Sequence, residues 1–131
     1  MEKLIQTHGT RKRAVARANL TSGKGIVTIN NQLLSSFSGP TNRLRISEPL
    51  VLAGDLAKNI DIDILVRGGG ANGQADASRL AIARALVKYD PKLKSQFYEY
   101  DRLLLVGDVR RKEVRKPNDS KARAARQKSY R

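Results

Sequence analysis

The 131-residue chain ends in a segment that cannot contribute to a hydrophobic core. Residues 110–131 contain no Leu, Ile, Phe or Met, and Val114 is their only branched apolar residue. Such a segment buries too little apolar surface to offset the entropy lost when it becomes ordered. We therefore expect one globular body over residues 1–106 and a basic extension over residues 107–131 that becomes ordered on a partner.

The formal net charge of +14 is concentrated at the two ends of the chain. Residues 1–25 hold six basic and one acidic side chain, residues 26–106 hold ten and eight, and residues 107–131 hold ten and three. Uncompensated cations repel one another unless a polyanion lies nearby. This distribution favours a nucleic acid as the partner.

The composition excludes several classes of catalytic and metal site. The chain has no Cys, and His8 is its only histidine, so disulfides, zinc fingers, iron–sulfur clusters and multi-histidine metal sites lack their ligands. No run of about 18 apolar residues occurs, and the first residues do not resemble a signal peptide. We expect a cytoplasmic, non-enzymatic protein with no cofactor, no metal and no membrane contact.

Alternating polarity predicts two strands. Residues 14–20 place three alanines and a leucine on one face and arginine and asparagine on the other. Turn-forming residues at 21–25 suggest that residues 26–30 are the return strand of a hairpin. Residues 60–66 place three isoleucines and Val66 on one face, which predicts a sheet with one covered and one partly solvated face.

Two segments have helical signals of different strength. Residues 47–53 predict a short helix with Pro49 in its first turn and Gly54 as its stop. Residues 73–89 are a stronger candidate, because apolar residues recur at i, i+3 and i+4 and alanine is frequent.

The remainder of the body predicts a second helix and a buried turn. Asp90-Pro91 ends the long helix and begins a short one that reaches about Phe97. Residues 103–106 are an apolar run too short to classify, either a buried strand or a turn. This order of elements predicts an α+β fold with one sheet and one layer of helices.

The segment Gly68-Gly69-Gly70-Ala71-Asn72-Gly73 matches the G-x-G-x-x-G pattern of dinucleotide-binding loops between a strand and a helix. The cofactor interpretation is weak, because the region about 20 residues later is the Asp90-Pro91 helix break rather than a second strand with an acidic residue. Two interpretations remain open. The glycines either only turn the chain, or they expose backbone N–H groups at a helix N-terminus that bind a phosphate of a nucleic acid.

Arg11, Lys12, Arg13 and Arg17 place four cations on or beside one strand. A charged run is usually a solvated face, but no acidic residue lies between Lys3 and Leu44 to neutralise this one. Phosphate contact is therefore the favoured interpretation.

A pair of acidic residues has a plainer interpretation. Asp61 and Asp63 lie two apart on one predicted strand, as paired catalytic carboxylates do, but no nucleophile accompanies them. We interpret them as a solvated strand face.

Residues 121–131 hold five cations and no anion, mostly separated by small side chains. Arginine forks bind phosphate oxygens in a bidentate manner, and alanine lets the backbone pass between closely spaced nucleic-acid strands. A solubilising tail or an import-like basic stretch are the alternatives.

Several motifs, taken in their order along the chain, resemble small-subunit ribosomal protein nine in its archaeal and eukaryotic form. They include residues 9–18, 23–25, 48–54, 68–75, 81–87 and 100–105, and the terminal Gln127-Lys128-Ser129-Tyr130-Arg131. Each motif is weak alone, but their common order across residues 9–131 is specific.

The resemblance implies a four-stranded sheet with helices on one face, like the second domain of ribosomal protein five, and an extended basic C-terminal tail. It also implies assembly with ribosomal RNA and neighbouring ribosomal proteins in the head of the small subunit. Lys128 and Arg131 would contact the anticodon stem-loop of peptidyl-site tRNA. The expected RNA-binding residues are Arg11, Lys12, Arg13, Arg17, Gly68, Gly69, Gly70, Asn72, Gly73, Gln74, Arg110, Arg111, Lys112, Arg115, Lys116, Lys121, Arg123 and Arg126.

Two positions depart from the pattern of that family. Residues 115–120 replace expected lysines, an aromatic residue and glycines, which affects the direction in which the tail leaves the body. Ser78 stands where an aliphatic is usual, which predicts looser packing. A free RNA-binding module or chaperone, and a nucleotide-binding enzyme that uses the glycine loop, remain as alternative functions.

Overall fold

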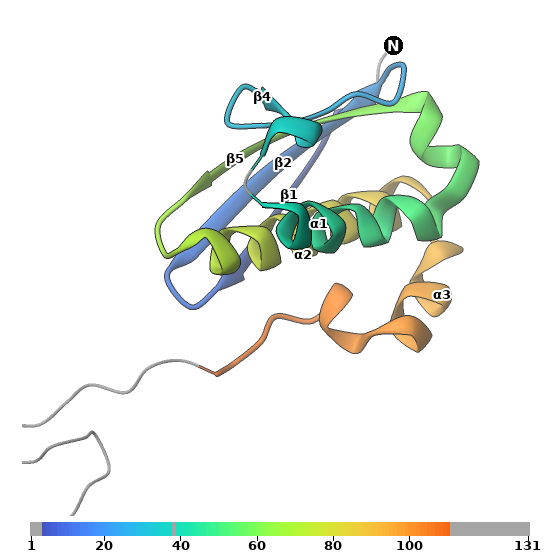
Figure 1. Cartoon of the computed structure of the whole chain (residues 1–131). Helices are drawn as coiled ribbons and strands as arrows, with labels where there is room; N and C mark the ends of the chain where they lie inside the picture. The colour runs from blue at the N-terminus through green and yellow to red at the C-terminus, as the bar shows by residue number, and fades with distance from the viewer. Residues whose placement is uncertain (1–3, 38, 111–131) are drawn as a thin grey trace, which may run out of the picture.

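A mixed five-stranded sheet with helices on one face forms the body of the molecule (Figure 1). The structure is a computed structural model and describes residues 4–37 and 39–110. The strands are β1 (Ile5–Arg11), β2 (Ala14–Ser22), β3 (Val27–Ile29), β4 (Gln32–Leu33) and β5 (Ile60–Arg67), in the sheet order β1-β2-β5-β3-β4. The helices are α1 (Pro40–Ala53), α2 (Ala71–Tyr89) and α3 (Leu93–Tyr100), with 3-10 turns at Leu34–Ser36, Gly54–Asn59 and Arg102–Leu104.

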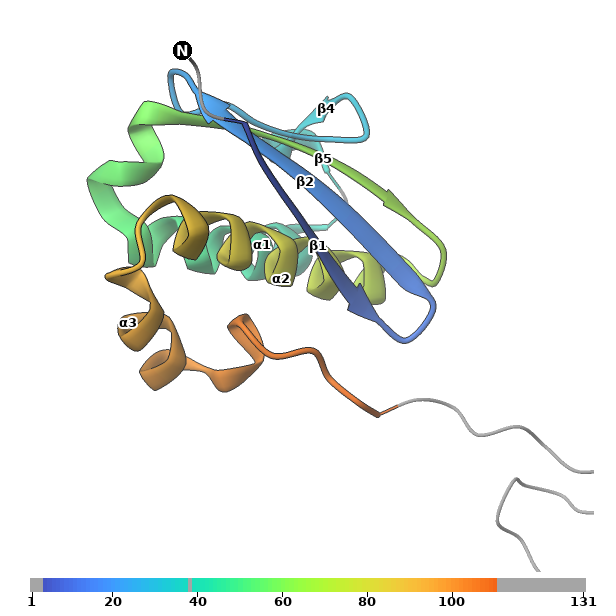
Figure 2. The same cartoon turned by 180° about the vertical axis from the view of Figure 1, so that it is seen from behind.

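The expected α+β fold with one helical layer is confirmed. The sheet has five strands rather than four because of β4, which is only two residues long. Figure 2 shows α1 and α2 side by side against one face of the sheet, and no helix of the described residues covers the opposite face. The domain boundary after residue 106 stays a prediction, because residues 111–131 lie outside the described part.

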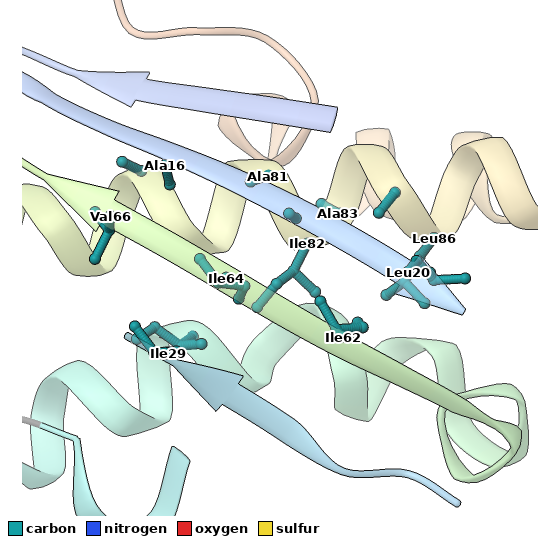
Figure 3. Packing of buried hydrophobic residues seen from close by; sticks show 14 of the residues in the cluster. Ala16, Leu20, Ile29, Ile62, Ile64, Val66, Ala81, Ile82, Ala83 and Leu86 are labelled. Atoms are coloured by element: carbon teal, nitrogen blue, oxygen red, sulfur yellow. The ribbon is translucent and has the colours of Figure 1, made fainter. Parts of the chain in front are cut away.

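The alternating strands pack as predicted. Ala14, Ala16, Ala18 and Leu20 of β2 and every second residue of β5 from Ile60 to Val66 are buried against α2. Figure 3 shows Ile62 and Ile64 of β5 beside Ile82 of the helix, and Leu20 of β2 beside Leu86. Small residues on β2 allow the helix to lie close to the sheet, while isoleucines fill the space beside it.

The predicted hairpin between residues 14–20 and 26–30 is wrong. β5 lies between β2 and β3 and pairs antiparallel with β2 and parallel with β3. The chain does reverse at residues 23–26, but Asp61 holds this loop across the start of β5 by accepting the backbone N–H groups of Lys24 (2.9 Å) and Ile26 (3.0 Å). A carboxylate 35 residues beyond Ile26 therefore helps to hold β3 beside β5.

The hairpin partner of β2 is β1, a strand that apolar alternation does not reveal. Its inward-facing side includes Thr7 and Gly9 in place of large aliphatics. The Thr7 hydroxyl donates to the carbonyl of Ala81 at 2.8 Å, and a Cβ on Gly9 would collide with the carbonyl of Ala77. β1 approaches the backbone of α2 so closely that large side chains do not fit there.

Helix α1 is twice as long as predicted. It begins at Pro40, which lies in its first turn. Pro49, the proline predicted for the first turn, lies inside the helix instead. The buried positions of α1 are Asn42, Ile46 and Pro49, which are spaced i, i+4 and i+7. Because the first of them is polar, the apolar period of a helix is not visible in the sequence. Gly54 ends the helix as predicted, with a φ of 65°.

Helices α2 and α3 lie close to their predicted positions. α2 begins two residues earlier than expected, and α3 begins at Leu93 and continues to Tyr100 rather than Phe97. Asp90 does not cap α3; its carboxylate accepts the N–H of Lys92 (3.1 Å) in the connecting turn. The apolar run at 103–106 is a turn, with Leu104 fully buried.

Ser78 is completely buried in α2, and its hydroxyl has no hydrogen-bond partner within the described residues. The expected looser packing at this position stays a prediction, and what the structure shows instead is an unsatisfied polar group in the core.

Candidate nucleic-acid interface

The glycine loop and the basic β1–β2 turn form one surface at the same end of the sheet. Gly68 and Gly69 have φ values of 79° and 67°, which favour glycine. A Cβ on Gly68 would lie 2.5 Å from the carbonyl oxygen of Arg13, and one on Gly69 would lie 3.2 Å from Ala14. The first two glycines therefore let the loop pack on the turn that carries Lys12 and Arg13.

The same loop leaves the start of α2 uncapped. Gly70 is the N-cap residue and supplies no side-chain cap, and the first turn of the helix lacks acidic residues. A Cβ on Gly70 would meet no atom within 4 Å, so the approach to this terminus is open. Gln74 donates its side-chain amide to the carbonyl of Gly68 (3.2 Å) and so fixes the loop, while Asn72 is exposed and Gly73 half-buried.

Lys12, Arg13 and Arg67 are the exposed cations of this surface, which we call the loop patch together with residues 68–72. Within the described residues, none of these three side chains has a hydrogen-bonded or ionic partner. Arg67 occupies an outward-facing position of β5, as the alternation of the strand predicts. No other cation lies near it in the sequence, so a search for clusters of charge does not find it. Free N–H groups, the positive helix end and the nearby cations Lys12 and Arg13 make the loop patch suited to a phosphate group. Arg67 extends the positive charge of the patch toward the sheet face opposite α2.

Arg11 lies beside the loop patch, but its guanidinium is engaged with carboxylates. Nε is 3.7 Å from a carboxylate oxygen of Asp76, and Nη1 is 3.4 Å from one of Asp108. Only 18% of its side chain is exposed. The arrangement suits Arg11 to holding β1 against α2 more than to reaching a phosphate.

Arg11 belongs to a larger ionic cluster around a hollow of about 500 Å³. Arg79 contacts Glu48 at 2.6 Å and Asp101 at 3.1 Å, and Arg45 contacts Asp76 at 3.5 Å. The hollow is lined by four arginines and four carboxylates, namely Arg11, Arg45, Arg79, Arg110, Glu48, Asp76, Asp101 and Asp108. This ionic cluster is neutral overall and ties α1, α2, β1 and the segment after α3 together.

Arg110 is the last predicted site residue that the structure describes. Its guanidinium contacts Asp108 at 2.6 Å, and its backbone N–H donates to the same carboxylate at 2.9 Å. The Arg110 side chain, followed by its backbone N–H and the charge of Arg11, holds the pKa of Asp108 well below its usual range. Asp108 thus fixes the chain at the point where the basic extension begins.

Arg17 is separate from the loop patch. It lies on the uncovered face of β2, where it is exposed and pairs in register with His8 and Leu65. A trough of about 650 Å³ on this face includes Arg17, His8 and Asp63, so charges of both signs are present.

The two aspartates interpreted as a solvated face have structural partners. Backbone N–H groups of Ile26 and Lys24 lower the pKa of Asp61, and Asp63 accepts the hydroxyl of Thr28 at 2.9 Å.

The remaining predicted site residues lie outside the described part of the chain. They are Arg111, Lys112, Arg115, Lys116, Lys121, Arg123, Arg126, Lys128 and Arg131. The departure at residues 115–120 lies there as well.

The surroundings of the glycine loop differ from those of a dinucleotide-binding unit. After α2 the chain enters α3 instead of a second strand parallel to β5, within the residues described. No helix of the described part is long and apolar enough to cross a membrane.

Comparison with known proteins identifies the family. The family model described as ribosomal protein S9/S16 matches residues 9–131. The chain belongs to this family. Small ribosomal subunit protein uS9 of Thermoplasma acidophilum is 54% identical over 127 residues, which cover 95% of this chain and 98% of the relative.

Two further relatives carry the same description. They are the uS9 proteins of Thermoplasma volcanium, 52% identical over 129 residues (97% of this chain, 98% of the relative), and of Methanococcus vannielii, 43% identical over 133 residues (98% and 99%). These archaeal relatives agree with the resemblance found in the sequence. Membership in a ribosomal protein family confirms the expected structural, non-enzymatic role.

Proposed function

We propose that this ribosomal protein is a structural component of the small ribosomal subunit that binds ribosomal RNA through the loop patch and through its basic C-terminal extension. The RNA-bound protein would reside with the ribosome in the cytoplasm, beside other proteins of the subunit head. The observation that carries the proposal is the packing of Gly68 on Arg13, because it brings an open helix N-terminus next to Lys12 and Arg13, two cations without a partner among the described residues.

The physical basis of binding is the release of counterions from RNA phosphates. The loop patch is preformed, because glycine packing and the Gln74 bond fix it before RNA arrives. The extension adds ten basic residues after residue 106. We infer that it orders on RNA and that its last residues, Lys128 and Arg131, reach peptidyl-site tRNA.

Salt-dependent binding to a transcript of small-subunit ribosomal RNA tests the loop patch. The variant Lys12→Gln/Arg13→Gln should flatten the plot of log affinity against log salt by about 1.5, since each phosphate contact contributes roughly 0.7 to 0.9. The variant Lys24→Gln/Lys58→Gln removes the same charge elsewhere and should change the slope much less. Equal slopes for both variants, or no salt dependence in the wild type, would refute the proposal.

The extension is tested separately. Deletion of residues 107–131 should flatten the same plot by several units. Removal of Arg131 alone should leave subunit assembly intact and weaken peptidyl-site tRNA binding. A subunit that fails to assemble without Arg131 would contradict the tRNA role.

A further inference from the structure

The free edge of the sheet is lined with cations from α2. Among the described strands β1 is the outermost, so the backbone groups on one of its sides have no strand partner there. The carbonyl of Gln6 accepts the Lys88 ammonium at 3.3 Å, and that of His8 accepts the Arg84 guanidinium at 3.0 Å. These side chains prevent another strand from pairing with this edge.

Arg84 is fixed in place by carbonyl groups of two distant segments. Its Nε donates to the carbonyl of Leu105 at 3.2 Å, and its Nη1 donates to His8, which leaves part of its five-donor fork free. Its only partners within residues 4–37 and 39–110 are carbonyl oxygens. A half-buried guanidinium held by neutral groups keeps its full charge for an external anion.

A groove of about 380 Å³ runs along this edge. Arg84, Lys88 and Lys94 line it together with His8, and no carboxylate is among its lining residues. Lys94 is exposed, and in the described part of the chain its ammonium has no partner. The ionic cluster, in contrast, has one carboxylate for each arginine.

We propose that this edge groove, lined by Arg84, Lys88 and Lys94, is a second RNA-binding site that takes the phosphodiester backbone. The identity of its polyanion rests on the proposed function, but the site is distinct from the loop patch. Ala71 and Lys88 are 17 residues apart on one helix, which corresponds to about 25 Å at 1.5 Å per residue. The two ends of α2 would therefore contact separate phosphates and fix the orientation of the body on RNA.

The RNA-binding assay distinguishes this site from the loop patch. The variant Lys88→Gln/Lys94→Gln should flatten the salt slope by about 1.5 relative to the wild type. The control Lys24→Gln/Lys58→Gln has the same net charge, and Lys58 already has Asp55 as a partner at 3.3 Å. Because Lys88 and Lys94 are exposed, thermal unfolding of the variant should match that of the wild type.

Each outcome has a definite meaning. A slope reduced only in Lys88→Gln/Lys94→Gln supports the edge site. An unchanged slope, or an equal reduction in the control, overturns it. This holds even if the variant binds an acidic protein of the subunit less tightly, because the proposal names RNA as the partner. If the wild type itself shows no salt-dependent binding, the proposed function fails as well.

Discussion

The two halves of α2 differ in what their cationic side chains contact. In the first half, Arg79 is held by Glu48 and Asp101, and Asp76 on the same helix holds Arg11 and Arg45. In the second half, Arg84 and Lys88 contact only carbonyl oxygens within the residues described. One helix therefore separates cations that stabilise the fold from cations whose charge is available to a partner.

The difference shows that cation count alone does not locate a binding surface. Arg11 is part of the most basic segment of the N-terminal region, yet its charge is neutralised by Asp76 and Asp108. Lys94 lies in the nearly balanced middle of the chain and faces a groove without carboxylates. The arrangement of counter-charges in three dimensions determines which cations are available to RNA.

The largest expected effect is at Arg79. Replacing it with methionine keeps an apolar stem but leaves Glu48 and Asp101 without their cation. Since both carboxylates are more than one-third exposed, water screens part of the loss, and we expect the free energy of unfolding to fall by about 1 to 2 kcal/mol. Urea denaturation measures this, and Lys94→Gln is the control that should stay within about 0.5 kcal/mol of the wild type. Equal effects of the two substitutions would remove the distinction between the halves of α2.

A smaller effect of opposite sign is expected at Ser78. Its buried hydroxyl lacks a partner, so Ser78→Ala removes an unsatisfied polar group and adds a residue with higher helix propensity. We expect the urea midpoint to rise, with a gain of about 1 kcal/mol in the free energy of unfolding. A loss of stability would show that the hydroxyl is satisfied.

Much of the fold follows from the sequence, because β2, β5 and α2 carry regular apolar periods that match their buried faces. β1 has no such period, because its close contact with the backbone of α2 requires the small residues Thr7 and Gly9 where large apolar side chains would otherwise be buried. The neighbour of β3 also escaped prediction, since its contacts, including those of Asp61 with residues 24–26, join segments far apart in the sequence. Local pattern cannot reveal such distant contacts.

The candidate site was predictable to a similar extent. The glycine loop and the basic turn were each visible as motifs, but nothing in their separate positions indicates that Gly68 packs on Arg13. Arg84 and Lys88 could not be predicted as site residues, because their spacing is that of an ordinary solvated helix surface. Their significance comes from the edge carbonyls of β1 and from a groove whose described lining contains no carboxylate.

The smallest effect concerns acid stability. The pKa of Asp108 is lowered in the folded protein, so the unfolded chain binds its proton first as the pH falls. The stabilisation from Asp108 is therefore complete above about pH 5, above the unfolded pKa of roughly 3.9, and is lost as the pH falls through the lower folded value. Asp108→Asn should make unfolding less dependent on pH below about 4. An unchanged acid profile would show that Asp108 does not fix the start of the extension.

Directed hydroxyl-radical cleavage in reconstituted small subunits tests most directly whether the cations without carboxylate partners face RNA. The chain has no native cysteine, so an iron chelate can be attached at single substitutions Arg13→Cys, Lys94→Cys and Lys58→Cys. We predict strong cleavage of ribosomal RNA from positions 13 and 94 and weak cleavage from position 58. Cleavage from position 58 as strong as from the other two, or no cleavage from positions 13 and 94, would contradict the account.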